Sequence, residues 1–249
     1  MGQRLITLTV ADTELSLAAA IDAPQHPRLG EDAGLVAGVA AQGVPITARL
    51  DVTVDTAVDF SMPAAAPSFI ETCRQKKIPL VLATTGLDEA QMTKMRAAAR
   101  EIPLLWSPNM SLAVNLTMRL AEAAAKALKD CDADVEILER HHRFKEDSPS
   151  GTALKFGQII AAAMGQTAHR HGREGRPGKR PHAEIGYHAI RVGDNPGEHT
   201  IVFGMLGETI ELSVRATNRD CYAAGALAAA KFLVGKKPGL YGMNDVLGL

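Results

Sequence analysis

Several features that mark common classes of protein are scarce in this sequence. Aromatic residues make up only 4% of the 249 residues, which argues against a surface that stacks on nucleic-acid bases. The formal net charge is −1, so no overall field attracts nucleic acid or an anionic membrane. No apolar run approaches the length of a membrane-spanning helix, and no signal-peptide pattern follows Met1. We expect a globular cytoplasmic protein that binds neither nucleic acid nor membrane.

Cysteines are also few. Cys73, Cys131 and Cys221 lie far apart, are odd in number and show no CxxC spacing. A disulfide framework or a zinc site is therefore not expected, and reduced thiols are typical of the cytoplasm. No other combination of histidine, cysteine and acidic residues has the spacing of a metal site, so we expect no bound metal.

The first 110 residues alternate between helical and strand-like patterns. Their strand-like segments, such as residues 79–83, are continuously apolar. This pattern is typical of a parallel sheet covered on both faces, so the expected fold class is α/β with a Rossmann-like doubly wound sheet. Helices are expected over residues 1–10, 64–77, 88–100 and 111–129, strands over residues 15–22, 57–60, 79–83 and 102–106, and a loop over residues 23–46.

The pattern changes near residue 111. Residues 111–219 contain strand-like segments separated by glycine-containing turns, which predicts a second, α+β domain with a mixed or antiparallel sheet. A helix expected over residues 222–234 either covers this sheet or returns, with the rest of residues 220–249, to the first domain (residues 1–110). Within the second domain, strands are expected over residues 134–142, 184–192, 199–205 and 209–216, and a helix over residues 153–164.

The most informative segment runs from His141 to Ala153. It places two histidines, an arginine and a lysine just before a helix that begins after Pro149. The N-terminus of a helix, capped by Ser150 or Thr152, is suited to binding a carboxylate or phosphate, and an imidazole can move a proton near neutral pH. Each residue taken alone fits a surface or capping role equally well, but together they predict an anion clamp beside an acid.

This segment resembles the active-site signature of the dihydrodipicolinate reductase family, HHRxKxDxPSGTA. The resemblance covers nearly the whole chain and implies an NAD(P)H-dependent enzyme of lysine and diaminopimelate biosynthesis. Its substrate would be a cyclic unsaturated dicarboxylate, 4-hydroxy-tetrahydrodipicolinate. It also implies that residues 1–110 bind the dinucleotide and that residues 111–219 bind substrate and form a homotetramer. Further matching motifs lie at residues 58–61, 83–86, 108–111, 197–200 and 235–241.

The resemblance assigns roles within the signature. His141 matches the proton donor, and Lys145 matches a catalytic lysine whose charge stabilises developing anionic character. The residues implied to bind substrate are His142, Ser150, Gly151 and Thr152. Arg143 adds charge or pairs with Asp147, and Phe144 replaces a residue that is often histidine in the family.

Cofactor contacts are expected at the ends of three strands. Asp22 is placed to hydrogen-bond the adenosine ribose, and Ala23 supplies no cation for a 2′-phosphate, so NADH is expected over NADPH. The alternative is that Asp22 only caps the turn at Pro24. The other residues expected at the cofactor follow two later strands, in loops that taken singly resemble ordinary turns: Ala83, Thr84, Thr85, Ser107, Pro108, Asn109 and Met110.

A doubly wound domain begins with a central strand and a glycine-rich turn, and neither precedes the first expected helix. Without that strand its two neighbours would lack a partner, at about 1–3 kcal/mol for each buried unpaired group. Two interpretations are open: the natural start lies upstream of Met1, or the chain binds cofactor poorly. The second leads to an alternative function, a non-catalytic relic that binds dicarboxylates or aids assembly. A different two-domain dehydrogenase is a third reading, against which the signature argues.

A basic segment at residues 169–181 has no assigned role. It lacks the glycine spacing of a P-loop, and nucleic-acid binding is less favoured than a mobile loop near an anionic substrate or a merely solvated loop. Three of the histidines outside the signature, His182, His188 and His199, are expected to be structural or surface residues.

Overall fold

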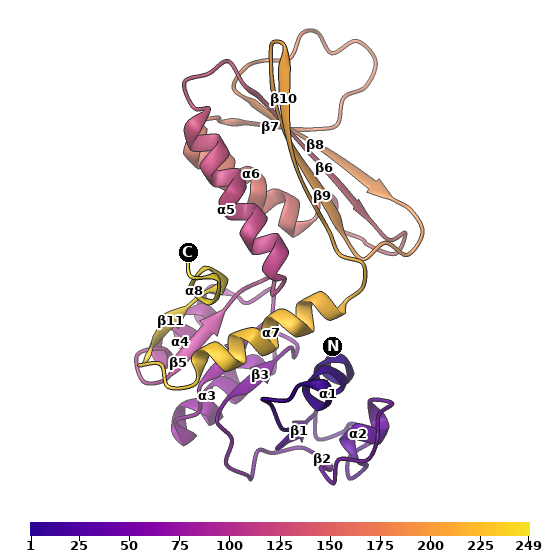
Figure 1. Cartoon of the computed structure of the whole chain (residues 1–249), viewed down its shortest axis with the longest axis vertical. Helices are drawn as coiled ribbons and strands as arrows, with labels where there is room; N and C mark the ends of the chain where they lie inside the picture. Colours follow the sequence, from indigo (N-terminus) through magenta and orange to yellow (C-terminus); the bar gives the residue numbers. More distant parts are fainter. The chain divides into compact units, whose positions relative to one another are not determined.

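The computed structural model describes residues 1–249, which divide into two compact units (Figure 1). The first unit combines Met1–Leu112 with Asp220–Leu249, and the second spans Ala113–Arg219. Each unit has its own hydrophobic core. No helix is both long enough and apolar enough for a membrane crossing.

The first unit is built on a parallel sheet. Its four strands, in the order β11-β5-β4-β3, are β3 (Ala57–Asp59), β4 (Leu80–Leu82), β5 (Pro103–Trp106) and β11 (Gly239–Tyr241). Every residue of β4 is buried, which explains why this strand is apolar at each position. The Rossmann-like parallel arrangement expected from the sequence is confirmed.

Helices cover both faces of this sheet. Leu80 and Leu82 of β4 pack with α3 (Ala66–Lys76) and α4 (Glu89–Ala98), whereas Val81 points to the other face and packs with α7 (Asp220–Leu233) and α8 (Met243–Leu247). The helix α4 begins at a capping box in which Asp88 accepts a hydrogen bond from the Gln91 backbone.

The front of the chain forms a separate small sheet. There, β1 (Ala20–Ile21) pairs in parallel with β2 (Ile46–Thr47), while β3 pairs only with β4. The strand expected over residues 15–22 is therefore wrong for residues 15–19, because a strand requires a partner and β2 supplies only two residues. The expected loop over residues 23–46 contains one helical turn, α2 (Ala33–Val36), capped by Asp32.

The first helix, α1 (Gly2–Ala11), is held to α7 by charged side chains. Arg4 donates two hydrogen bonds of 2.6 Å to the Asp220 carboxylate. Lys231 of α7 pairs with Asp12 and Glu14, just beyond the end of α1, at 2.7 and 2.6 Å. The two ends of the first unit's sequence are thereby joined.

The second unit contains a five-stranded mixed sheet. Its strands, in the order β10-β9-β6-β8-β7, are β6 (Asp134–His141), β7 (Ala168–His171), β8 (Glu184–Arg191), β9 (Glu198–Met205) and β10 (Glu208–Arg215). The central β6 is parallel to β8 and antiparallel to β9. The strand β7 was not predicted, because an exposed edge strand with the sequence Ala-His-Arg-His has no apolar alternation.

Two helices cover one face of this sheet, and the other face carries none (Figure 1). They are α5 (Leu112–Ala127) and α6 (Gly151–Met164). Their apolar residues pack on Val135, Ile137 and Phe203 of the sheet. Because side chains alternate along β6, Val135, Ile137, Glu139 and His141 share the covered face.

Candidate active site

His141 lies on the covered face at the end of β6 and is only 8% exposed. Its Nδ1 is 2.5 Å from Oε2 of Glu139, two residues earlier on the same strand and therefore on the same face. A carboxylate can only accept, so Nδ1 carries the proton of this bond and Nε2 is left to exchange protons with a substrate.

Glu139 is buried and fully paired. Arg191, at the end of β8, donates to both carboxylate oxygens at 2.7 and 2.8 Å, and the Ser150 backbone N–H donates at 3.0 Å. Burial raises the pKa of Glu139, but hydrogen bonds from His141, Arg191 and Ser150 outweigh it and lower the pKa to about 2. A buried negative charge is therefore fixed beside the histidine.

His199 joins this cluster from β9. It lies opposite Glu139 in the antiparallel register, and its ring meets that of His141 edge-on at 5.2 Å. Its Nε2 is 3.0 Å from Ser150 Oγ. Burial lowers the pKa of His199 to about 4, with further lowering by His141, so the ring is neutral at pH 7. His199 was expected to be structural or at the surface, yet it lies 4% exposed against two signature residues.

Ser150 is the cap of α6. Its Oγ accepts a hydrogen bond from the Ala153 backbone at 3.2 Å, so Ser150 and not Thr152 holds this position. The helix that follows presents the Gly151 and Thr152 backbone at its N-terminus. The Asp147 carboxylate accepts hydrogen bonds from Lys145 Nζ, at 2.7 Å, and from the Gly151 backbone. This N-terminus and Lys145 therefore hold a carboxylate of the chain itself, that of Asp147.

The remaining signature residues differ in exposure. Arg143 is exposed, and Asp147 pairs with Lys145 and not with Arg143. Phe144 is 78% exposed. His142 Nδ1 is buried and has no hydrogen-bond partner, which leaves a polar group for a ligand to satisfy.

The expected cofactor residues of the first unit lie at the carboxyl ends of parallel strands. Thr84 lies just beyond β4 and Ser107 follows β5, while Asp59, which was not among the expected cofactor residues, ends β3. Asp59 Oδ2 and Thr84 Oγ1 are buried without hydrogen-bond partners. Ligands of open parallel sheets bind at this edge, so two orphaned polar atoms there fit a dinucleotide with hydrogen-bonding groups.

The loops at this edge differ in what they can offer. Thr85 and Pro108 are exposed, and the Asn109 side chain accepts a hydrogen bond from the Ser111 backbone at 2.9 Å. Ala83 and Met110 are 7% and 2% exposed and belong to the core on the α7 side. These two residues can therefore meet a ligand mainly through their backbone.

Asp22 follows β1 and is exposed. Its carboxylate accepts a hydrogen bond from the Ala23 backbone at 2.7 Å and lies 3.7 Å from His26 Nε2. The side chain keeps 51% of its surface exposed. The turn contact expected of a capping residue is present, and a ribose hydroxyl still has access to the carboxylate.

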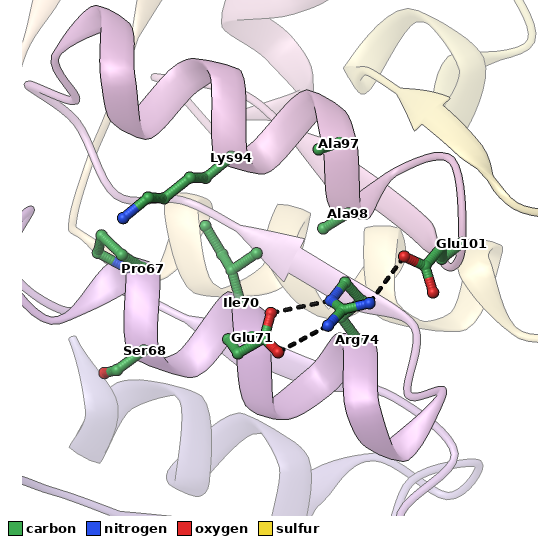
Figure 2. A pocket seen from close by; sticks show the side chains of 9 residues that line it. All are labelled: Pro67, Ser68, Ile70, Glu71, Arg74, Lys94, Ala97, Ala98 and Glu101. Carbon is green, nitrogen blue, oxygen red and sulfur yellow. Dashed lines mark hydrogen bonds and ion pairs between the residues drawn. The ribbon is translucent and has the colours of Figure 1, made fainter.

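A surface pocket of about 550 Å³ lies between α3 and α4, away from all the expected site residues (Figure 2). Arg74 crosses its rim and pairs with Glu71 and Glu101 at 2.7 and 2.8 Å. Because none of the expected site residues lines it, we assign this pocket no role in catalysis.

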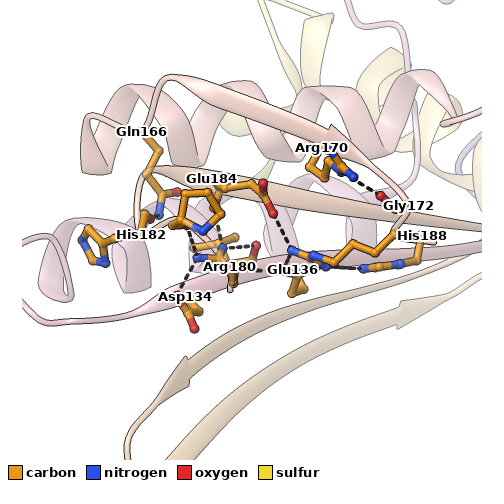
Figure 3. A network of polar contacts seen from close by, with 12 residues as sticks. Asp134, Glu136, Gln166, Arg170, Gly172, Arg180, His182, Glu184 and His188 are labelled. Atoms are coloured by element: carbon orange, nitrogen blue, oxygen red, sulfur yellow. Dashed lines mark hydrogen bonds and ion pairs between the residues drawn. The ribbon is translucent and has the colours of Figure 1, made fainter. Parts of the chain in front are cut away.

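Two arginines of the basic segment form ion pairs with the sheet, and Figure 3 shows those of Arg180. Arg173 pairs with Glu136 and Glu184, both at 2.6 Å, and Arg180 pairs with Asp134 and Glu136 at 2.6 and 3.0 Å. For these two residues neither expectation holds, since they are neither merely solvated nor available to an anionic substrate. No group of three or more His, Cys, Asp or Glu residues is arranged as a metal site.

Sequence comparisons identify relatives along the full chain. Residues 1–110 match the family model described as dihydrodipicolinate reductase, N-terminus, and residues 113–247 match its C-terminus. The chain is 57% identical to the 4-hydroxy-tetrahydrodipicolinate reductase of Rhodopirellula baltica, covering 100% of this chain and 92% of that protein. It is 45% identical to the enzyme of the same name from Alkalilimnicola ehrlichii, covering 100% and 95%.

Solved structures agree with the sequence matches. A dipicolinate-bound dihydrodipicolinate reductase from a Paenisporosarcina species has a TM-score of 0.79 and 25% identity, covering 98% of this chain and 94% of that one. An enzyme of gentamicin A biosynthesis in complex with NAD has a TM-score of 0.59 at 14% identity, covering 99% and 87%, which is a likeness of fold alone. The matched models cover both units, and the chain belongs to the dihydrodipicolinate reductase family.

Proposed function

We propose that this chain reduces 4-hydroxy-tetrahydrodipicolinate to tetrahydrodipicolinate with a nicotinamide cofactor, a step of lysine and diaminopimelate biosynthesis. The observation that carries the proposal is the buried pair of Glu139 and His141 beside the capped N-terminus of α6. An acid and a carboxylate site are thereby joined in a chain whose curated relatives are named for this reaction. One relative of known structure holds dipicolinate, a cyclic dicarboxylate.

The reaction replaces a hydroxyl group by hydrogen. The hydroxyl group leaves as water together with one ring hydrogen, and a hydride and a proton enter the ring system; a bound nicotinamide would supply the hydride. In this proposal His141 delivers the proton from Nε2, and Lys145 stabilises negative charge as it develops. His142 contacts the substrate through its unpartnered ring nitrogen. Ser150, Gly151 and Thr152 bind one substrate carboxylate at the start of α6.

For the cofactor, we propose contacts at the carboxyl ends of β4 and β5 and at Asp22, which follows β1 in the separate small sheet. Asp22 would accept hydrogen bonds from the adenosine ribose. The proposed contacts along the other two loops are Ala83, Thr84, Thr85, Ser107, Pro108, Asn109 and Met110. The orphaned Thr84 Oγ1 supports this placement.

The same site supports a preference for NADH. The exposed Asp22 carboxylate would repel the 2′-phosphate of NADPH, and its neighbour Ala23 supplies no compensating cation. We expect kcat/KM to be higher with NADH than with NADPH. The variant Asp22→Ala should reduce the ratio of kcat/KM with NADH to kcat/KM with NADPH. Equal kcat/KM values for both cofactors would contradict the preference and leave the reductase activity intact.

We also propose a homotetramer formed through the uncovered face of the second unit's sheet. Leu138 and Ile190 on this face are 37% and 42% exposed, and no helix covers them. Light scattering should give about four times the 26.4 kDa chain mass. The free cysteines, including the exposed Cys131, support the reducing cytoplasm as the proposed cellular location.

The decisive experiment is an assay with purified protein. Calorimetry should detect binding of NADH, and absorbance at the reduced nicotinamide band should fall when 4-hydroxy-tetrahydrodipicolinate is added. His141→Gln should still bind NADH and lose most turnover, because the amide cannot deliver the proton. A protein that binds the substrate but neither binds NADH nor shows turnover would refute the proposal and favour the non-catalytic alternative.

A further inference from the structure

Three parts of the candidate site meet at the Glu139 carboxylate. It accepts hydrogen bonds from the ring of His141, from the backbone of Ser150 and, through both oxygens, from Arg191. Arg191 in turn donates to the Asp147 carbonyl at 2.7 Å, so the same cluster reaches the loop that holds Lys145. No donor in this arrangement can move without breaking a bond to the same buried charge.

We propose that Glu139 is a positioning residue that couples the proton donor to the carboxylate clamp. This inference rests on the proposed function, in which His141 is the acid and the start of α6 binds a substrate carboxylate. The carboxylate fixes the orientation of the imidazole through Nδ1 and the position of α6 through the Ser150 N–H. The distance between the proton and the bound substrate is therefore set by one side chain.

The carboxylate also sets which nitrogen of His141 reacts. Oxygens of a carboxylate accept only, so Glu139 requires a proton on Nδ1 and directs the exchangeable proton to Nε2. When the ring takes up its second proton, the negative charge at 2.5 Å stabilises the imidazolium. Glu139 thus orients the donor and supplies its counter-charge.

An amide cannot replace this carboxylate. The four donor contacts are divided between the two oxygens: His141 Nδ1 and Arg191 on Oε2, and Ser150 N and Arg191 on Oε1. Glutamine has one oxygen and one NH₂ group, so in either orientation an N–H meets other donors. Glu139→Gln therefore loses the hydrogen bonds accepted by one of the two oxygens, without a large change of side-chain volume.

The same strand supplies a matched control. Glu136 also lies on β6 and also binds a histidine and arginines, namely His188, Arg173 and Arg180. Burial raises the pKa of Glu136, but these partners lower it to about 2, as for Glu139. Glu136 points to the opposite face of the sheet, away from His141. Glu136→Gln therefore removes a similar ion-pair cluster without touching the site.

Because other charged groups surround His141, the loss of the Glu139 charge should change the pH dependence of kcat/KM. His199 from β9 is neutral at pH 7, and Arg191 from β8 and Lys145 from the loop are cationic. In Glu139→Gln the cations lose their counter-charge, which disfavours the imidazolium. The fall of kcat/KM at alkaline pH should therefore begin at a lower pH in this variant than in wild type.

The experiment compares wild type, Glu139→Gln and Glu136→Gln by nitrogen-15 NMR of labelled histidine and by kinetics. The His141 resonance is assigned by its loss in His141→Gln. Wild type should carry the neutral-ring proton on Nδ1. Glu139→Gln should lose that preference, lower kcat about 100-fold, shift the alkaline limb and bind NADH within twofold of wild type. Glu136→Gln should keep the wild-type tautomer, kcat and pH profile.

Three results would overturn the inference: a neutral wild-type ring with its proton on Nε2, a Glu139→Gln variant with wild-type kcat and pH profile, or equal losses in both variants. If Glu139→Gln fails to fold, the wild-type tautomer decides alone, since it is read without substrate. A wild-type protein that shows the Nδ1 tautomer and no reductase activity would refute the proposed function separately.

Discussion

The candidate site consists of ionisable groups whose charge states are fixed by what they touch. Glu139 remains ionised although it is buried, because His141, Arg191 and Ser150 all donate to it. His199 remains neutral because burial lowers its pKa to about 4. A permanent anion, a neutral ring and a proton-carrying ring thus lie side by side, an arrangement suited to directing one proton.

Lys145 is predicted to act in turnover and not in cofactor binding. Lys145→Ala should lower kcat about 100-fold, because a cation near the developing negative charge is lost. NADH affinity, measured by calorimetry, should stay within twofold of wild type. The exposed Lys129→Ala is the control for the loss of a surface charge. Unchanged turnover in Lys145→Ala would remove this residue from the mechanism.

The buried His199 is predicted to make the folded protein less stable in mild acid. The unfolded ring binds a proton near pH 6.5 and the folded ring only near pH 4, so stability is full above pH 6.5 and is lost as the pH falls towards 4. This pKa difference corresponds to roughly 3 kcal/mol. Urea unfolding at pH 7 and pH 4.5 should show a smaller loss in His199→Gln than in wild type.

The exposed His182→Gln serves as the control for that measurement. It removes a histidine without removing a buried one, so its loss between the two pH values should equal that of wild type. An equal loss in His199→Gln and wild type would show that His199 does not cause the acid sensitivity.

Among the elements, β6 places two groups of ionisable side chains on opposite faces of the sheet, because its side chains alternate. Its covered face ends in Glu139 and His141, and its open face carries Glu136 with the arginines of the basic segment (Figure 3). The helix α6 supplies the clamp, and its position depends on close packing against β8. A Cβ at Gly157 of α6 would lie 1.7 Å from the Tyr187 hydroxyl oxygen.

Gly157→Ala is therefore predicted to destabilise the second unit. The added methyl group must displace Tyr187 or α6, which costs about 1–3 kcal/mol in a packed core. Urea unfolding should show this loss, and KM for substrate should rise as the start of α6 moves. Gly2→Ala, whose Cβ would meet nothing within 4 Å, should be neutral or slightly stabilising. Equal stability of both variants would contradict the packing argument.

At the scale of the whole molecule, the two units differ in which parts of the sequence form them. The first takes its sheet from both ends of the sequence, since β11 pairs with β5, and the second is one continuous segment. Only the second leaves a sheet face without helices, with Leu138 and Ile190 on it. Burial of such a face by other copies of the chain is the basis of the proposed tetramer.

Leu138→Glu is predicted to dissociate that tetramer. A charge on the buried interface would be costly, so the mass by light scattering should fall while far-UV circular dichroism stays unchanged. Leu154→Glu is the matched control, because both leucines are 37% exposed and Leu154 lies on α6. A variant Leu138→Glu that retains the wild-type mass would exclude this face as the interface.

Local patterns were sufficient for much of the fold and for the family. The capping residue Asp88, the apolar run of β4 and the alternation of β6 each predict their element, because a cap or a burial period is encoded in neighbouring residues. The strands β7 and β11 were missed because short or polar strands carry no such period. The family predicted from the signature and the fold class are confirmed by the comparisons.

The signature residues of the site were found because they are contiguous. Its supporting residues were not: Arg191 lies 52 residues from Glu139, and His199 lies 49 residues from Ser150. Strand register brings these pairs together, and register is set by burying the apolar faces of β6, β8, β9 and β10 at once. Sequence therefore determined which groups can do chemistry, and only the folded sheet decided which of them share a buried charge, because that depends on contacts far apart along the chain.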